Sequence, residues 1–402
     1  TSDRMKRILY CESNVDGTVG GSHYCLLYLL RHLDRTRYPP TVVFYDDHAI
    51  VGKFRAVAET LVLDKDQPST LPLAPLRRAI NLGKLTAKIA RQMAFLRERQ
   101  IDLVHLNNSI TRHHDWMIAA RLSGVPCVVS ERGLPQYGGL DRRLGKRLDA
   151  IIPMSTWIAR AMVAQGVAPD NIRVIYDGLD PEQFIAAQPA DAVRSAWNIG
   201  PTQPIIGIVG NIRYWKGQET VARALVEIAR VHPDVVCFFV GAVTAEDQAY
   251  YQEIQSVLAA AGIEKNVRFT GFQENVAQFT ALMQVVVHAS VHPEPFGMVV
   301  LEAMARRKPV VGSRAGGVVE MVVEGQTGYT FPPGDAATLA ARVTELLNDP
   351  EMAGSMGQRG YERLVKDFSV ETCMRSMHGL YEAVFAGRPL PAAVPLEVGM
   401  PA

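Results

Sequence analysis

Short apolar runs alternate with longer segments of helical period along the whole chain. Segments such as His23–Leu33, Trp116–Leu122, Gln218–Arg230, Asp247–Ala261, Ala336–Asn348 and Thr372–Phe385 carry apolar residues at the spacing of one helix face. The runs that predict strands are Arg7–Tyr10, Thr41–Tyr45, Leu61–Leu63, Leu103–Leu106, Cys127–Ser130 and Ala150–Pro153, followed by Ile205–Val209, Val235–Val240, Val267–Thr270, Val285–Ala289, Pro309–Gly312 and Tyr329–Phe331. Strands that alternate with helices predict an α/β fold with parallel sheets.

The chain has 402 residues, which is more than one ordinary core needs and suits two domains. A stretch rich in Pro, Gly and Ala between Ala186 and Pro204 separates two alternating series. We therefore place an N-terminal domain at residues 1–195 and a second domain at 196–375. Because such sheets bind ligands at the carboxyl ends of their strands, we expect a site built from both domains, in a cleft between them.

Composition and charge narrow the class of protein. Hydrophobic residues make up 48% and charged residues 21% of the chain, as in globular proteins, and the formal net charge of +1 implies no attraction to nucleic acid. No apolar run is long enough to span a bilayer, so we expect a cytoplasmic protein. The odd number of scattered cysteines fits neither a disulfide framework nor a zinc pattern and favours a reducing compartment.

The strongest chemical signal is the segment His288–Gly297, in which a strand ends, a Pro-rich turn follows and Gly297 opens a helix. Free amides at a helix start suit a phosphate or a sugar oxygen. Glu294 stands in the loop, whereas Glu302 lies inside an almost wholly apolar helix, where a carboxylate should be buried or paired. Carboxylates suit the vicinal hydroxyls of ribose or a hexose. The alternative is a solvated loop glutamate and a surface helix glutamate.

The run His288–Asp335 resembles the signature of the retaining glycosyltransferases of family four, which have the GT-B fold of two Rossmann-like domains. The resemblance is strong over most of Ile205–Phe385 and weak over the first half. It implies that Glu294 contacts the transferred sugar and that Glu302 binds the ribose of a UDP- or GDP-sugar donor. It also implies that a C-terminal segment, 376–402, crosses back to the N-terminal domain. Other implied donor contacts are Gly271, Phe272, Pro295, Phe296, Gly297 and Met298.

A second signal is the loop Gly210–Gly217, which joins a predicted strand to a predicted helix. Glycine permits close backbone approach, while Arg213 and Lys216 bring positive charge to a diphosphate. The resemblance implies a lysine at Lys216 and an arginine directly after Gly210, where this chain has Asn211. We expect Arg213 to take over that role. The alternative is a basic surface loop.

The first half carries weaker signals. Gly20 and Gly21 before a helix are a weak form of phosphate-binding turn, with a plain strand-to-helix turn as the alternative. His105 and Asn107 share one face of a predicted strand end. The resemblance implies a histidine near the transferred sugar where this chain has Asn107, which can bond a sugar hydroxyl but cannot act as a general base.

Two further groups follow nearby strands. The cluster His113–Asp115 could compensate for the missing histidine, although such clusters more often cap their own helix. The resemblance implies that Glu131 and Arg132 contact the acceptor or the sugar. Asp64 and Asp66 resemble a metal-binding Asp-x-Asp pair but stand in the wrong half of the chain and are better read as a turn. We therefore expect neither a metal nor a cofactor.

The segment Leu71–Gln100 is basic, with Arg77, Arg78, Lys84, Lys88, Arg91, Arg97 and Arg99 against a single Glu98. Its apolar stripe is Leu82, Leu85, Ile89, Met93 and Leu96. Such a helix can lie on an anionic membrane, and the alternative, slightly favoured, is that the stripe packs on the sheet. Arg142, Arg143, Lys146 and Arg147 form a second basic cluster.

Together these signals predict a retaining, metal-independent hexosyltransferase that acts on a glycan or lipid-linked acceptor in bacterial cell-surface polysaccharide or glycolipid synthesis. Two other classes stay open. One is another GT-B sugar-nucleotide enzyme, such as an epimerase, and the other is a non-catalytic nucleotide-sugar sensor, for which Asn107 and Asn211 are the only hints.

Overall fold

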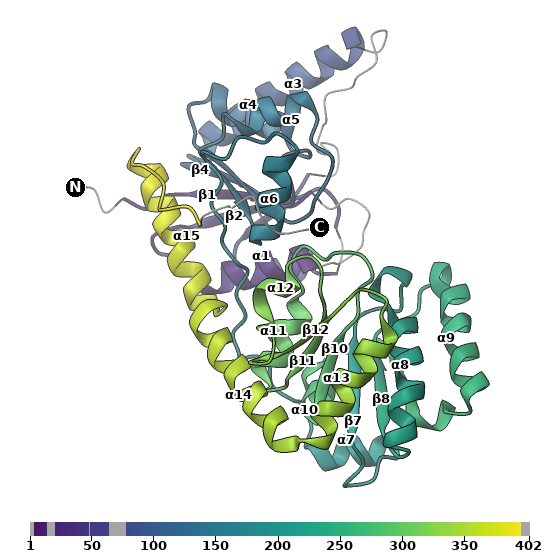
Figure 1. Cartoon of the computed structure of the whole chain (residues 1–402). Coiled ribbons are helices and arrows are strands. Elements are labelled where there is room, and N and C mark those ends of the chain that lie inside the picture. Colours follow the sequence, from purple (N-terminus) through teal and green to yellow (C-terminus); the bar gives the residue numbers. More distant parts are fainter. Residues whose placement is uncertain (1–3, 14–20, 48, 64–77, 395–402) are drawn as a thin grey trace. The chain divides into compact units, whose positions relative to one another are not determined.

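The computed structural model describes residues 4–13, 21–47, 49–63 and 78–394, with side chains described from residue 83 onward in the last range (Figure 1). Packing divides the chain into an N-terminal unit, Thr1–Gly178 with Val370–Pro401, and a C-terminal unit, Leu179–Ser369. The sequence predicted domain boundaries near residues 195 and 375. In the structure the two boundaries lie earlier in the chain, after Gly178 and after Ser369, and a parallel bridge joins Leu179 to Ser369 there.

The N-terminal unit is built on one six-stranded parallel sheet in the order β3-β2-β1-β4-β5-β6. Its strands are β1 (Ile8–Cys11), β2 (Pro40–Phe44), β3 (Glu59–Val62), β4 (Leu103–Leu106), β5 (Cys127–Glu131) and β6 (Ala150–Pro153). Its helices are α1 (Gly21–His32), α2 (Val51–Arg55), α3 (Arg78–Glu98), α4 (His114–Leu122), α5 (Gly139–Gly145), α6 (Thr156–Ala164) and α15 (Val370–Phe385).

The C-terminal unit repeats this topology, with the parallel order β12-β11-β10-β7-β8-β9. Its strands are β7 (Ile205–Val209), β8 (Val236–Val240), β9 (Val267–Gly271), β10 (Val285–His288), β11 (Val310–Ser313) and β12 (Gly328–Phe331). Its helices are α7 (Ala190–Ala196), α8 (Gln218–Val231), α9 (Gln248–Ala261), α10 (Ala277–Leu282), α11 (Met298–Ala305), α12 (Val318–Met321), α13 (Ala336–Asn348) and α14 (Pro350–Asp367), with short 3-10 turns η1 (Tyr214–Lys216), η2 (Ala245–Asp247) and η3 (Glu264–Asn266).

The predicted α/β class with two parallel sheets is confirmed, and each run predicted as a strand overlaps an observed one. Central strands such as β10 are buried along their whole length, because helices cover both faces of a parallel sheet. Helix α8 buries Val221, Leu225 and Ile228 on the face that its periodicity predicted.

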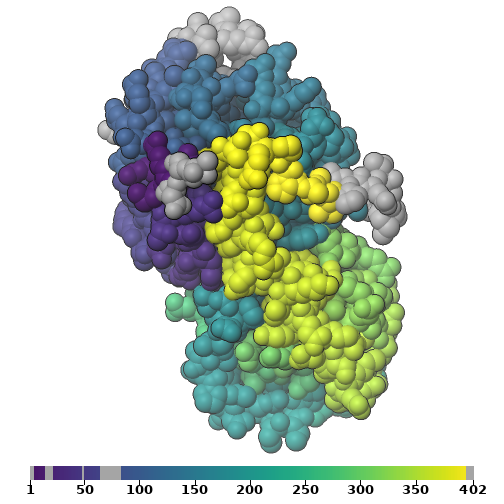
Figure 2. Space-filling model, turned by 90° about the vertical axis from the view of Figure 1, so that its left-hand side faces the viewer, coloured from purple at the N-terminus to yellow at the C-terminus, as the bar shows by residue number. Residues whose placement is uncertain are grey.

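Helix α15 belongs to the N-terminal unit although it follows the C-terminal unit in the sequence. Figure 2 shows it in yellow against the purple and blue residues of that unit. Its Tyr381 hydroxyl lies 2.6 Å from His105 Nδ1 and 3.0 Å from the Tyr10 hydroxyl, all three side chains being buried. The second ring nitrogen of His105 lies 2.7 Å from the Ser130 hydroxyl. This chain of hydrogen bonds joins the last helix to strands β1, β4 and β5.

Replacing Tyr381 by Phe should therefore weaken the N-terminal unit. The change leaves His105 Nδ1 and the Tyr10 hydroxyl without their partner in the core, which should cost about 1–3 kcal/mol. Urea unfolding followed by circular dichroism measures the loss. Tyr24→Phe is the matched control, since its ring is 39% exposed and the change should stay within about 0.5 kcal/mol. Equal effects of the two substitutions would contradict the assigned role of the hydroxyl chain.

Candidate active site

The C-terminal sheet reverses its strand order between β7 and β10, which lie side by side while their following strands run to opposite edges. Loops that leave such neighbours diverge and open a ligand crevice at the carboxyl ends. Here the two loops are tied together, because the Val291 amide donates to the Trp215 carbonyl oxygen over 2.9 Å. The sequence-predicted Lys216 and Glu294 stand on these two loops.

Glu294 is held by three side chains that all reach one oxygen, Oε1. Lys216 Nζ lies 2.8 Å from it, His288 Nε2 lies 2.9 Å from it, and the Ser290 hydroxyl donates to it. Burial alone would raise the pKa of this carboxyl, but the hydrogen bond and charge of His288 and the charge of Lys216 outweigh burial and hold it well below its usual range. No residue in the described part of the chain bonds the other oxygen, Oε2, which is thus left to accept from a ligand.

The backbone around Glu294 is fixed by glycines. Gly316 has φ +64°, and a Cβ there would overlap the Glu294 carbonyl oxygen, so only glycine fits. The next amide, of Gly317, donates to that same oxygen over 2.9 Å. On the other side, Gly217 has φ +72°, and a Cβ there would overlap the Ala289 carbonyl oxygen. The loops after β7, β10 and β11 therefore pack backbone to backbone.

Helix α11 begins directly after this loop, with Gly297 at φ +104° before its first residue, Met298. Phe296 is buried and anchors the turn, and Pro295 precedes it. The first amides of α11 have no acceptor inside the helix, so they face outward at the carboxyl edge of the sheet.

Glu302 stands one turn into α11, on the same face as Met298. Its carboxylate is half-buried and makes no hydrogen bond with any described residue. Burial raises the pKa of this carboxyl to about 7, although the nearby charge of Lys216 lowers it. The lysine thus acts on both glutamates.

The remaining donor-site predictions lie at the same edge. Gly210 and Asn211 follow β7, and the Asn211 side-chain oxygen accepts from the Ala242 amide over 3.1 Å. Arg213 is half-exposed, and its one ion-pair partner among the described residues is Asp247, with 3.7 Å between the charged groups. Gly271 ends β9 and Phe272 follows it, with the Phe272 ring 75% exposed.

The N-terminal unit has a corresponding switch point between β1 and β4. Asn107 lies there but is buried, because its amide nitrogen donates to Glu12 over 2.5 Å and its oxygen accepts from Arg132 over 2.6 Å. Arg132 also holds Asp177 at 2.6 Å. These residues satisfy one another inside the unit.

His105 is placed differently from a ligand-binding residue. Both of its ring nitrogens are engaged in the core, and burial, with a smaller contribution from Arg132, lowers its pKa to about 3, so the ring is neutral. In this conformation it presents no free nitrogen to a ligand.

Glu131 ends β5 and is buried, with Oε2 accepting from the Ile110 amide at 3.0 Å and the Ser109 hydroxyl at 3.1 Å. Burial raises the pKa of this carboxyl to about 8 despite those hydrogen bonds. Glu131 is therefore protonated near neutral pH.

The cluster after β4 is structural. His114 Nε2 lies 2.7 Å from Asp141, His113 Nε2 lies 3.2 Å from the Asn107 carbonyl oxygen, and Asp115 is ion-paired with Lys88 at 2.9 Å. Burial lowers the pKa of His113 to about 4. Lys88, one of the basic residues of the segment Leu71–Gln100, is buried, and Ile89 and Leu96 of its apolar stripe are buried as well.

Gly20, Asp64 and Asp66 lie outside the described residues, and Gly21 opens α1. Within the described ranges, no group of three or more His, Cys, Asp or Glu side chains could hold a metal ion, and no helix is both long and apolar enough to cross a bilayer.

Sequence reasoning gave no role to His288, Ser290 or Glu12. His288 and Ser290 alternate at the end of β10, so a two-residue period could have placed both on one face with the carboxylate that follows. Glu12 gave no such signal, since its partner Asn107 is distant in sequence.

Two family profiles match this chain: "Glycosyltransferase Family 4" over residues 19–183 and "Glycosyl transferases group 1" over residues 190–363. It is 29% identical over 344 residues to the 2-deoxystreptamine glucosyltransferase of Streptomyces kanamyceticus, covering 78% of this chain and 87% of that protein. It is also 29% identical over 304 residues to the N-acetyl-alpha-D-glucosaminyl L-malate synthase of Bacillus anthracis, covering 73% and 78%. Among solved structures, Anabaena Alr3699/HepE in complex with UDP superposes with a TM-score of 0.81 at 24% identity, covering 94% of this chain and 100% of that one.

The pKa of Glu131 predicts a pH-dependent stability. Because its folded pKa of about 8 lies above the ordinary 4.5, the stability contributed by the protonated carboxyl is present in full below about pH 4.5 and lost as pH rises through about 8. Glu131→Gln stays neutral at every pH. Its free energy of unfolding should therefore rise by a few kcal/mol relative to that of the wild type as pH increases over this range, since each pKa unit is worth about 1.4 kcal/mol. Denaturant unfolding at several pH values measures the difference, and a difference that does not change with pH would contradict the buried, protonated carboxyl.

Proposed function

The chain belongs to the group 1 and family four glycosyltransferases and has the GT-B fold, and from this premise we propose that it moves a hexosyl unit from a UDP- or GDP-sugar to a hydroxyl of a glycan or lipid-linked acceptor, with retention of anomeric configuration. The product would belong to bacterial cell-surface polysaccharide or glycolipid synthesis. The observation that carries the proposal is the ionised Glu294, fixed through Oε1 and open at Oε2, beside Lys216 at the switch point of the sheet.

The reaction needs a stabilised diphosphate leaving group and a sugar held in one orientation. An ammonium group has three donors, so Lys216 can keep its bond to Glu294 while it binds a phosphate oxygen. The outward amides of α11 and the positive end of that helix supply further stabilisation where negative charge develops. Glu294 Oε2 then accepts from a hydroxyl of the transferred sugar.

Arg213 takes the second cationic role in this proposal. Its side chain is 41% exposed, and its 3.7 Å ion pair with Asp247 is long, so a turn of the guanidinium toward a phosphate costs little stability. Asn211, at the position after Gly210, is occupied by the Ala242 amide and serves the turn. Two side-chain cations and a helix start can balance the diphosphate, which is why we propose a reaction without a metal.

Glu302 is proposed to bind the donor ribose, since its half-buried carboxylate has no protein hydrogen bond among the described residues. Phe272, exposed after Gly271, is proposed to lie near the base. On the N-terminal unit, Glu131 and Arg132 are proposed to shape the acceptor region through the residues they hold, while Asn107 positions Arg132.

The nucleoside of the donor can be identified by a thermal-shift screen over UDP-, GDP- and ADP-sugars. UDP-glucose is the first to test, because Alr3699/HepE was crystallised with it. The tightest donor then serves the two predictions below.

Glu294→Gln should reduce release of the nucleoside diphosphate from the donor by about 100-fold or more, since it removes a charge that acts on the reacting sugar. Donor affinity should change less than about threefold, because the nucleotide is held elsewhere. Loss of affinity equal to the loss of rate would contradict the division of roles.

The same assay tests the metal-free assignment when a chelator is added. Wild-type activity that the chelator abolishes would overturn that assignment.

Glu302 should make donor affinity depend on pH. With a pKa of about 7, its carboxylate accepts ribose hydrogen bonds fully only above that pH, so affinity should rise as pH passes from 6 to 8. A sugar nucleotide has no phosphate proton to lose in this range. Glu302→Gln should bind about tenfold more weakly at pH 8 and show little pH dependence, since hydrogen bonds to charged groups are the stronger ones. Calorimetric titration measures both.

Glu351→Gln, at an exposed position in the first turn of α14, is the control for a lost carboxylate. An unchanged affinity in Glu302→Gln, or a pH dependence that survives the substitution, would overturn the ribose assignment.

A further inference from the structure

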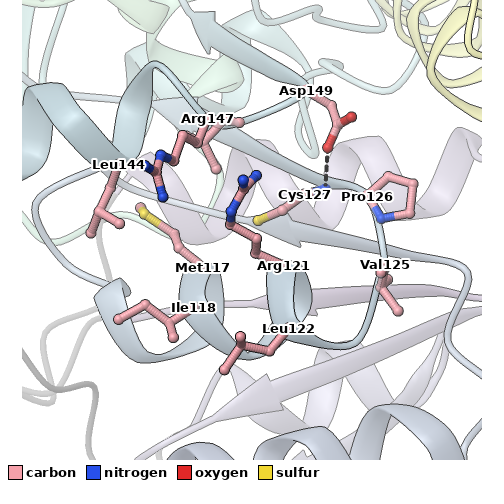
Figure 3. A pocket seen from close by; sticks show the side chains of 12 residues that line it. Met117, Ile118, Arg121, Leu122, Val125, Pro126, Cys127, Leu144, Arg147 and Asp149 are labelled. Carbon is pink, nitrogen blue, oxygen red and sulfur yellow. Dashed lines mark hydrogen bonds between the residues drawn. The ribbon is translucent and has the colours of Figure 1, made fainter.

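The N-terminal sheet has a hollowed surface at the amino ends of its strands β5 and β6. A cavity of about 400 Å³ opens there between the last turns of α4 and α5 and the first residues of β5 and β6 (Figure 3). Its walls are mainly apolar and include Met117, Leu122, Leu144 and Leu148. Arg121 and Arg147 also line it, and in the view of Figure 3 their guanidinium groups lie on the same side of α4 as Met117 and away from Ile118 and Leu122.

The arginines of this surface are not paired with carboxylates in the part of the chain that the structure describes. Arg121 and Arg147 are exposed and have no ion pair with any residue that the structure describes. Asp149, the carboxylate in the wall, is already engaged, because its Oδ2 accepts from the Cys127 amide over 2.8 Å. Arg143 and Lys146, on and just after α5, are exposed as well and likewise unpaired within the described ranges.

A second cavity of about 410 Å³ continues the same edge and shares Val125 with the first. It has the same chemistry, since Arg97 stands beside Met93 and Leu96. The carboxylate there, Asp102, accepts from the Arg7 amide over 2.9 Å and lies 3.9 Å from Lys6 Nζ. The amino-end edge of this sheet thus repeats one motif, an apolar hollow beside an arginine that has no ion pair with any described residue.

Apolar and cationic groups are interleaved rather than separated. Leu122 is 62% exposed and directly follows Arg121. A nucleic acid would bind through the cations alone, and an exposed leucine would add nothing to that binding. A lipid surface uses both kinds of group, because its phosphates bind the guanidinium groups and its acyl chains accommodate the apolar side chain. The net charge of the whole chain is only +1, so an attraction to an anionic surface needs a local group of cations such as this one.

We propose that the surface formed by Arg97, Arg121, Leu122 and Arg147 docks on an anionic phospholipid membrane, with a lipid phosphate between Arg121 and Arg147. This docking surface lies at the ends of α3 and α4 and just after α5, rather than along the length of α3. The inference does not rest on the proposed reaction, because it needs no donor and no acceptor.

The test is co-sedimentation of the full chain with vesicles of phosphatidylcholine and of an equal mixture of phosphatidylcholine and phosphatidylglycerol. The wild type should pellet with the mixed vesicles only, and less as salt is raised. The double substitution Arg121→Glu with Arg147→Glu should weaken partition by more than about tenfold, since each basic residue near an anionic surface contributes appreciably. Leu122→Ser should weaken it less and leave the salt dependence in place.

The matched control is Arg31→Glu with Arg160→Glu, two exposed arginines of α1 and α6 in the same unit that change the net charge equally. Vesicle binding kept by this control and lost by the Arg121 and Arg147 variant supports the proposal, with circular dichroism confirming that both variants fold. Equal loss in both variants, pelleting with neutral vesicles, or no pelleting of the wild type would overturn it. Competition by inorganic phosphate at concentrations far below those of the salt titration would also overturn it, because it would assign the arginines to a soluble anion.

Discussion

The ion pair between Lys216 and Glu294 is the interaction around which the carboxyl edge of the C-terminal sheet is built. Its groups are only 18% and 12% exposed, so both charges lose most of their hydration. Pairs of this kind contribute little net stability, because desolvation offsets the attraction. The protein nevertheless adds His288 and Ser290 to the same oxygen and uses glycines at Gly217 and Gly316 to bring three loops together. Because this arrangement adds little to the stability of the fold, its best explanation is that it positions Lys216 and Glu294 for a ligand.

Most of the fold follows from local pattern, because a strand buried on both faces must be a short apolar run and the helices between strands must be amphipathic. Helix α14 was absent from the sequence interpretation, and its glycines explain why. Gly357 and Gly360 weaken helical propensity, yet a Cβ at Gly357 would overlap the Arg307 carbonyl oxygen and one at Gly360 would lie 3.3 Å from Met304 Cγ. They serve the close packing of α14 on α11, which is a tertiary property. The crossing of α15 to the first unit was likewise implied only by resemblance.

The candidate site was predictable where it is local in sequence. Glu294 and Lys216 each follow a strand, and the order of the strands brings them together. Burial was harder to foresee. In the sequence, Lys88 looks like one of several surface cations, but in the structure it is paired with Asp115 of another helix at 2.9 Å. The sequence likewise suggests that the Asn107 amide is available to a ligand, whereas Glu12 and Arg132 bind its nitrogen and its oxygen. Such roles depend on partners far along the chain, which periodicity does not report.

The two sheets share one strand order but use their switch points in opposite ways. In the C-terminal unit, one oxygen of Glu294 and both oxygens of Glu302 have no hydrogen-bond partner among the described residues. These oxygens can therefore accept hydrogen bonds from a ligand without a rearrangement of the protein. In the N-terminal unit, Glu12, Asn107, Arg132 and Asp177 close into a network that satisfies itself. A satisfied buried network binds ligands poorly but fixes the backbone of the loops around it. The first edge thus offers carboxylate oxygens to a ligand, while the buried network at the second edge holds loops in place. Under the proposed function, acceptor recognition at the second edge would come from the surfaces of those loops rather than from the buried side chains beneath them.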